Sequence, residues 1–318
     1  MEPVVTGPSG RPVVVALGGN ALLRRGESPD VARQRRNVEG AAAALAAVAR
    51  DRRLVITHGN GPQVGVLALQ SEASSTPSPL DVLGAETEGM IGYLIEQALG
   101  NRLPGRPVAT LLTQVLVSAA DPAFRAPTKP IGPIYAEAEA RRLAAERGWT
   151  VAPDGTSFRR VVASPQPLEI VELSTIRLLL DAGVTVICAG GGGVPVVADA
   201  VGSLHGVEAV IDKDLSAALL AERLGASLLV MLTDVAAVER DWGTPAAQPI
   251  GTIDTGGMRA LRFASGSMGP KVEAACRFVE ATGGTAAIGS LAEAEAVVRG
   301  ESGTRIVPGA EGPAAVAV

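Results

Sequence analysis

Lysine is scarce in this sequence. The 318-residue chain contains 28 lysines and arginines, and only Lys129, Lys213 and Lys271 are lysines. Arginine serves as a general cation, whereas lysine provides a compact and flexible ammonium group. Because this chain uses arginine for most of its cations, the three lysines indicate positions that require an ammonium group. Three lysines among 28 cations are also compatible with chance, so the surrounding residues must decide.

Other scarcities exclude whole classes of protein. Aromatic residues make up 3% of the chain and hydrophobic residues 47%, which indicates a core of small aliphatic side chains, typical of stacked α/β layers. Two cysteines, Cys188 and Cys276, are too few for a disulfide framework or a metal cluster, and we expect buried thiols. The longest apolar stretch, residues 41–49, is too short to cross a bilayer. The N-terminus has no secretory pattern. These features predict a cytoplasmic protein.

Charge is weak and mixed. The formal net charge is −5, and acidic and basic residues alternate without a basic stripe. Nucleic acids and anionic membranes are bound by clustered lysine and arginine. We therefore expect a small-molecule partner, with no nucleic acid and no membrane.

Short apolar runs alternate with helical segments along the chain. Residues 13–17 and 53–57 are typical of buried strands, residues 31–50 of a helix, and residues 207–211 of a further strand. This alternation predicts an α/β fold with a mainly parallel, doubly wound sheet. In such sheets ligands bind at the carboxyl ends of the strands.

One segment differs from this pattern. Between residues 119 and 167, prolines and charges become frequent around a single expected helix. We interpret the segment as an inserted flap. The two ends of the chain, residues 1–11 and 309–318, are expected to be loose tails.

Glycine-rich turns follow several of the expected strands. Their backbone N–H groups can form an anion-binding concavity, and phosphate is the natural ligand. The sequence has no GxxxxGK[ST] motif, which excludes a Walker-type P-loop. Residues 190–195 do not fit GxGxxG because Pro195 stands at the last position, so a dinucleotide fold is weakly supported.

Each lysine has its own context. Lys271 follows Pro270 at the expected start of a helix, where a cation opposes the helix dipole unless an anion is also bound, so we expect a nucleotide phosphate there. Lys213 lies between Asp212 and Asp214. This cluster is either a solvated strand end or a site where Lys213 neutralises a transferred phosphoryl group, with Asp214 orienting the lysines or Mg²⁺.

The remaining candidates are less specific. Lys129 lies between Thr128 and Pro130 in the flap, and proline-stiffened backbone can hold one side chain over a site. A loop cation alone has no such implication. His58 follows the second expected strand, and we expect it to have a hydrogen-bonded structural role.

Taken together, these segments resemble the carbamate kinases, a branch of the amino-acid kinase family. The resemblance extends from about residue 13 to about residue 307. The matching runs are residues 14–21, 58–65, 112–115, 127–133, 190–197, 206–214, 266–268 and 270–271.

The resemblance implies reversible phosphoryl transfer between ATP and carbamate, giving ADP and carbamoyl phosphate, often toward ATP in arginine catabolism. It implies a three-layer αβα sandwich with a protruding subdomain, Mg²⁺ and a homodimer. An acceptor lobe would span residues 12–213, including the subdomain, and a nucleotide lobe residues 214–308.

The resemblance also implies residue roles. Lys129 would lie over the carbamate site, Lys213 would stabilise the transferred phosphoryl group, Asp214 would organise the lysines, and Lys271 would bind nucleotide phosphate. Backbone amides would hold carbamate or its phosphate at Gly18, Gly19, Asn20, Gly59, Asn60 and Gly61. Nucleotide contacts would come from Thr233, Asp234, Val235, Ser267, Met268 and Lys271.

Three positions refine or weaken the resemblance. Relatives that act on glutamate or acetylglutamate typically carry lysine where this chain has Asn20. On the nucleotide side, Ala236 replaces a frequent acid, and Trp242 stands where tyrosine is common. These two changes leave the adenine contacts open. A related acid kinase would need space for a larger carboxylate, and a silent binding module would lack a transferring lysine.

Overall fold

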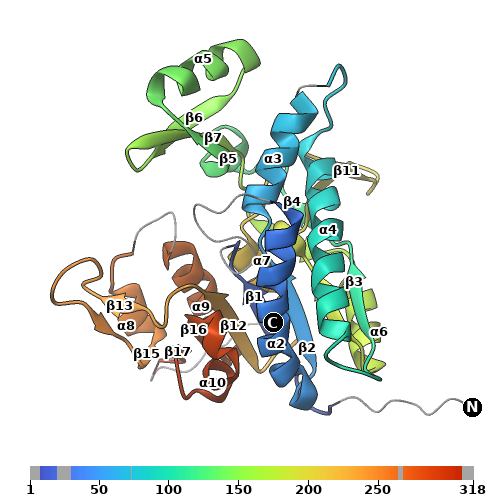
Figure 1. The fold of residues 1–318 in the computed structure, drawn as a ribbon, viewed down its shortest axis with the longest axis vertical. Helices are drawn as coiled ribbons and strands as arrows, with labels where there is room; N and C mark the ends of the chain where they lie inside the picture. The colour runs from blue at the N-terminus through green and yellow to red at the C-terminus, as the bar shows by residue number, and fades with distance from the viewer. Residues whose placement is uncertain (1–7, 20–29, 73, 264–267, 310–318) are drawn as a thin grey trace, which may run out of the picture.

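The structure is a computed structural model, and it describes residues 8–19, 30–72, 74–263 and 268–309. An eight-stranded sheet forms its centre, with the strand order β15-β17-β16-β12-β1-β2-β9-β3 (Figure 1). Neighbouring strands are parallel except for β16 and β17. The strands are β1 (Val13–Leu17), β2 (Leu54–His58), β3 (Val108–Leu111), β9 (Thr185–Cys188), β12 (Leu228–Thr233), β15 (Thr252–Asp254), β16 (Thr285–Ser290) and β17 (Thr304–Val307).

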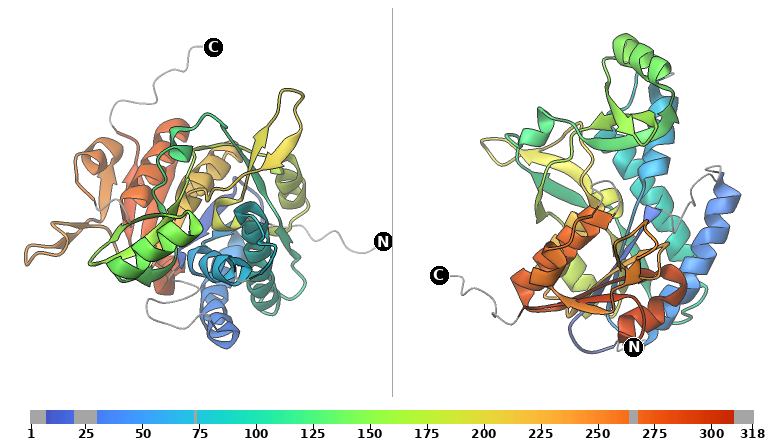
Figure 2. Two further views of the ribbon diagram at one scale, coloured as in Figure 1. Left: turned by 90° about the horizontal axis from the view of Figure 1, so that it is seen from above. Right: turned by 90° about the vertical axis from the view of Figure 1, so that its left-hand side faces the viewer.

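Both faces of this sheet are covered. Every residue of β1 is buried, with Val14 and Ala16 in one core and Val13, Val15 and Leu17 in the other. A central parallel strand has to be apolar on both sides for this reason. One face packs against α6 (Leu173–Asp181), α7 (Lys213–Arg223) and α9 (Met268–Thr282), and the other against α2 (Val31–Asp51), α4 (Leu80–Gly100) and α10 (Ala294–Arg299). The expected three-layer αβα sandwich is confirmed (Figure 2).

The expected flap is a separate small unit. Strands β5 (Lys129–Tyr135), β7 (Ser157–Val162) and β6 (Thr150–Asp154) form its sheet, which α5 (Glu137–Arg147) accompanies at the top of Figure 1. The unit rests on α3 (Gly61–Glu72), where a Cβ atom at Gly65 would lie 2.2 Å from the Gly132 Cα. Because no side chain fits between these backbones, α3 and β5 are in direct contact.

The remaining elements lie around the main sheet. None of the helices in the described part of the chain is long and apolar enough to cross a membrane. Both cysteines are buried free thiols, as expected. A four-stranded sheet contains β11 (Leu204–Gly206), β10 (Val194–Ala198), β4 (Gln114–Val117) and β8 (Pro167–Ile170), and the short elements are β13 (Glu239–Arg240), β14 (Gln248–Pro249), α8 (Thr255–Arg259), η1 (Pro122–Phe124), η2 (Gly190–Gly192) and η3 (Leu291–Glu293).

The strand expected at residues 207–211 is wrong. In this part of the described chain the ladder strand is β11, at Leu204–Gly206, and Ala209 makes one isolated bridge. Ala209 and Ile211 are nevertheless buried. The apolar run therefore reports burial rather than strand pairing. The following Asp212 is the N-cap of α7, so the charged triplet begins a helix instead of ending a strand.

Candidate active site

The glycine turns after β1 and β2 lie against each other. The Gly59 N–H donates to the Leu17 carbonyl at 3.0 Å. A Cβ atom at Gly59 would lie 3.0 Å from the Gly19 nitrogen and 3.3 Å from the Lys213 Cδ. Any side chain at Gly59 would therefore separate the two turns and displace the lysine.

The acceptor candidates lie around this contact. Gly18 donates its N–H to the Leu232 carbonyl at 2.8 Å, which joins the first turn to the end of β12. Gly61 is the first residue of α3, so the second turn leads directly into a helix N-terminus. Backbone N–H groups at such a position can bind an anion. Asn20 and Ser267 lie outside the described residues.

All three lysines reach one pair of aspartates. The Lys129 Nζ lies 2.6 Å from the Asp212 Oδ2. The Lys213 and Lys271 Nζ atoms lie 2.6 Å and 3.0 Å from the two carboxylate oxygens of Asp214. The flap, the start of α7 and the start of α9 therefore contribute cations to a single site.

Local structure explains how Lys213 and Asp214 are placed. The Asp212 side chain accepts from the N–H groups of Asp214 and Leu215 at the start of α7. This capping fixes the first turn, in which Lys213 is the first residue. Lys271 lies in the first turn of α9. Two helix N-termini thus carry lysines, an arrangement that favours anion binding.

Burial and neighbouring charges shift the pKa values of the charged groups in this site. Burial opposes the ionised form of Asp214, but Lys213 and Lys271 hold its pKa well below the usual value. Burial also opposes the charge on Lys213, yet Asp214 raises the pKa of this lysine. Burial and the neighbouring Lys213 lower the pKa of Lys271. Three ammonium groups face two carboxylates, so one positive charge remains in excess for an anionic ligand.

The nucleotide candidates follow β12. Thr233 ends that strand, and its hydroxyl donates to the Asp234 Oδ1 at 3.0 Å. Val235 and Met268 are half-buried, and Met268 packs against the core beneath α9. Trp242 is 73% exposed. The β12 end and the start of α9 therefore leave polar and apolar groups beside the lysines.

The described residues offer no cluster of three or more His, Cys, Asp or Glu side chains that could hold a metal ion. Asp212 and Asp214 are the carboxylates nearest the lysines, and both already accept from ammonium groups. These carboxylates fit a lysine-organising role and do not fit a metal site formed by the protein alone.

Sequence reasoning missed Glu88. This residue of α4 is 1% exposed, and burial raises its pKa to about 8, although hydrogen bonds from the Gly190 and Thr113 amides work in the opposite direction. The spacing of Glu88 from Ile91 and Ile95 places it on the buried helix face, which is a signal that the sequence contained. His58 is buried as well, and burial lowers its pKa to about 4.

The chain is similar to known proteins over most of its length. The model of the Amino acid kinase family matches residues 11–290. Carbamate kinase from Haemophilus influenzae is 54% identical over 303 residues, which cover 94% of this chain and 98% of the relative. Carbamate kinase from Escherichia coli K12 is 51% identical over 92% of this chain and 98% of its own length.

A solved structure extends the likeness to three dimensions. Carbamate kinase from Giardia lamblia bound to AMP-PNP superposes with a TM-score of 0.87 and 42% identity, covering 95% of this chain and 99% of that structure. The chain therefore belongs to the amino acid kinase family and, within it, to the carbamate kinases, which are ATP-dependent phosphotransferases.

Proposed function

We propose that this protein transfers a phosphoryl group reversibly between ATP and carbamate, giving ADP and carbamoyl phosphate. The convergence of Lys129, Lys213 and Lys271 on the half-buried Asp212 and the buried Asp214 is the observation that carries this proposal. Phosphoryl transfer requires mainly positioning and charge stabilisation. A protein nucleophile is not required, because a carbamate oxygen attacks the γ-phosphorus and the bond to ADP breaks.

Each charged residue has a separate role in this proposal. Lys213 lies against Gly59 and stabilises the phosphoryl group in transfer, while Lys271 binds nucleotide phosphate. Lys129 reaches over the acceptor from the flap, and Asp214 accepts from both Lys213 and Lys271, which fixes their positions and offsets their mutual repulsion. The turns at Gly18, Gly19, Asn20, Gly59, Asn60 and Gly61 hold carbamate, and Thr233, Asp234, Val235, Ser267 and Met268 contact the nucleotide.

Mg²⁺ is part of the proposal as a companion of the nucleotide. Because Asp212 and Asp214 are occupied by lysines, nucleotide phosphates would provide the ligands for the ion. Mg²⁺ commonly binds through substrate phosphates and few protein groups. Its chemistry would be neutralisation of phosphate charge.

The direct test is an assay of the purified protein with Mg²⁺, ADP and carbamoyl phosphate. We expect ATP to form. Omission of Mg²⁺ should abolish the reaction. If no ATP forms, while ATP is consumed with glutamate or acetylglutamate, the protein is instead a related acid kinase.

Replacement of Lys271 tests the nucleotide side. In Lys271→Ala we expect the KM for ADP to rise by about tenfold, because one charge-assisted phosphate contact is lost. The KM for carbamoyl phosphate should stay within about twofold of wild type, since Lys129 and Lys213 remain. Initial rates over both substrates measure this. An unchanged KM for ADP would remove Lys271 from the site.

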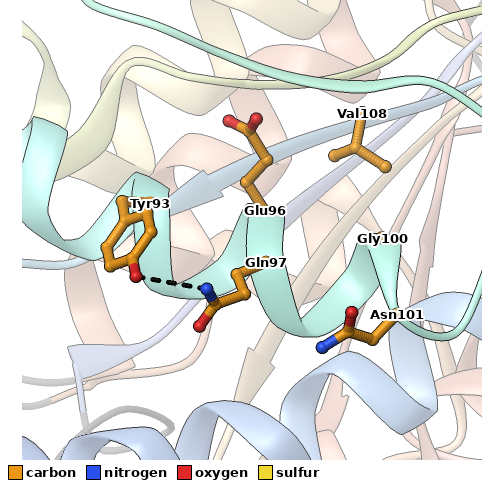
Figure 3. Close-up of a pocket in the computed structure, with 6 residues that line it drawn as sticks. All are labelled: Tyr93, Glu96, Gln97, Gly100, Asn101 and Val108. Carbon is orange, nitrogen blue, oxygen red and sulfur yellow. Dashed lines mark hydrogen bonds between the residues drawn. The ribbon is translucent and has the colours of Figure 1, made fainter.

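We also propose that the protein forms a homodimer. A homodimer is supported by the free edge that β3 presents within the described sheet, beside the exposed Tyr93 and Leu112. A hollow of about 300 Å³ lies there, lined by Tyr93, Glu96, Gln97, Gly100, Asn101 and Val108, which are drawn in Figure 3. Sedimentation of wild type and Tyr93→Asp would test it, with a monomer expected for the variant.

The remaining parts of the proposal concern organisation and pathway. Residues 12–213 would form the acceptor lobe and residues 214–308 the nucleotide lobe. The enzyme would act in the cytoplasm and run toward ATP in arginine catabolism. Loss of arginine-dependent ATP formation in a strain lacking the protein would support this direction.

A further inference from the structure

The four-glycine turn, Gly190 to Gly193, follows β9 and lies between the loop after β2 and the residues that precede Lys213. A Cβ atom at Gly190 would lie 2.4 Å from the His58 Nε2, and one at Gly191 would lie 2.1 Å from the Asn60 Nδ2. On the other side, a Cβ atom at Gly192 would lie 2.6 Å from the Ile211 carbonyl oxygen. The bare backbone of this turn therefore sets the spacing between the acceptor loop and the residues that lead into Lys213.

Glu88 holds this turn from α4. Its Oε1 accepts from the Gly190 N–H at 2.7 Å, and its Oε2 accepts from the Thr113 N–H at 3.3 Å. The Thr113 hydroxyl in turn accepts from the Ala189 N–H at 2.9 Å. Ala189 has φ 50°, a left-handed conformation that is costly for a residue with a side chain. These contacts hold Ala189, at the start of the turn, in a conformation that its side chain disfavours.

The neighbouring Thr87 holds the acceptor loop. The Asn60 Nδ2 donates to the Thr87 hydroxyl at 2.9 Å. That hydroxyl has one proton, which it donates to the helix carbonyls of Leu83 and Gly84. It can therefore only accept from Asn60, which fixes the orientation of the Asn60 amide. Consecutive residues of α4 thus fix both the acceptor loop and the glycine turn.

A carboxyl group in this position is not needed for packing. Glu88 is faced by His58 from β2, by Glu172 before α6 and by Cys188 from β9. Burial of a carboxyl group among such neighbours is unfavourable, and an uncharged side chain would avoid the cost. Its two oxygens match two backbone donors that belong to different loops.

We propose that Glu88 is a positioning residue for the phosphoryl acceptor, which acts by fixing the glycine turn between Asn60 and Ile211. It makes no contact with the reacting groups in this scheme. The inference rests on the proposed function for its kinetic consequence, but not for its structural one.

Glu88→Gln is the informative variant when it is assayed near pH 9, above the pKa of about 8 of the Glu88 carboxyl, because it then keeps the size of the side chain and removes one of two acceptor oxygens. One backbone N–H must then face an amide NH₂ group. We expect the KM for carbamoyl phosphate to rise about tenfold, as for a buried donor left unpaired, with the KM for ADP unchanged. The matched control is Glu86→Gln on the same helix, where the Glu86 side chain is exposed. It should leave both KM values unchanged.

Hydrogen exchange provides a readout that needs no activity. In Glu88→Gln we expect faster exchange of amides in the peptide that spans residues 189–193, and no change there in Glu86→Gln. If wild type makes no ATP, the proposed function fails, and this exchange still tests the hold on the turn. Unchanged exchange would overturn the inference. So would a lower kcat with both KM values unchanged, or an equal rise in both KM values, because these indicate a general loss of structure.

Discussion

Lys213→Ala is expected to lower kcat for ATP formation by about a thousandfold, as loss of a preorganised donor to a developing charge does. The Lys213 side chain is 15% exposed, and its Cδ would lie 3.3 Å from a Cβ atom at Gly59. The Lys213 side chain therefore lies beside the second glycine turn, where that turn meets the first. Coupled assays at saturating ADP and carbamoyl phosphate measure the effect.

Lys213→Arg separates charge from shape. The guanidinium keeps the charge but is planar and larger than an ammonium group, so it presents the charge in a different geometry and we expect activity to remain at least about a hundredfold below wild type. Thermal unfolding and circular dichroism check that both variants are folded. A folded Lys213→Ala that retains more than about a tenth of the wild-type kcat would contradict the role of Lys213.

The sequence allows the sheet to be predicted because its strands are locally distinctive. The apolar runs at β1 and β2 are buried on both faces, and the glycines that follow them mark their carboxyl ends. Residues 207–211 are also mostly apolar, but Ala209 and Ile211 are buried by packing and not by a ladder. Periodicity reports burial, and only tertiary contacts determine whether a buried run pairs.

The site could be predicted residue by residue but not as an arrangement. Each lysine has a local reason to bind an anion, whereas the shared contacts with Asp212 and Asp214 depend on how α7, α9 and the flap pack. Glu88, in contrast, could not be recognised as a site residue from its local sequence. Its sequence neighbours indicate an ordinary helix, and its importance arises from two loops that reach it from elsewhere in the chain.

Asp214→Asn is expected to lower the free energy of unfolding by about 3–5 kcal/mol, because breaking a buried ion pair leaves an uncompensated charge. Here both Lys213 and Lys271 lose their shared carboxylate, which is 4% exposed in wild type. Urea unfolding measures the loss. Asp181→Asn is the matched control, since Asp181 pairs with Arg53 at 71% side-chain exposure and should contribute less than about 1 kcal/mol.

The stability that Asp214 contributes should depend on pH. Burial opposes ionisation of Asp214, but the two lysines hold its pKa below the usual 3.8. A carboxyl whose folded pKa is depressed stabilises the protein above its unfolded pKa, and the contribution is lost as pH falls through the folded value. The difference between wild type and Asp214→Asn should therefore be constant from neutral pH to about pH 5 and shrink in stronger acid.

A second replacement identifies the cause of the instability. Adding Lys271→Met to Asp214→Asn removes one of the two facing ammonium groups, so we expect part of the lost stability to return. The single variant Lys271→Met completes the double-mutant cycle. If Asp214→Asn costs no more than Asp181→Asn, or if the second replacement restores nothing, Asp214 does not offset the repulsion between the two lysines. Its role would then be limited to the first turn of α7, and the charge-neutralising arrangement proposed for phosphoryl transfer would lose its support.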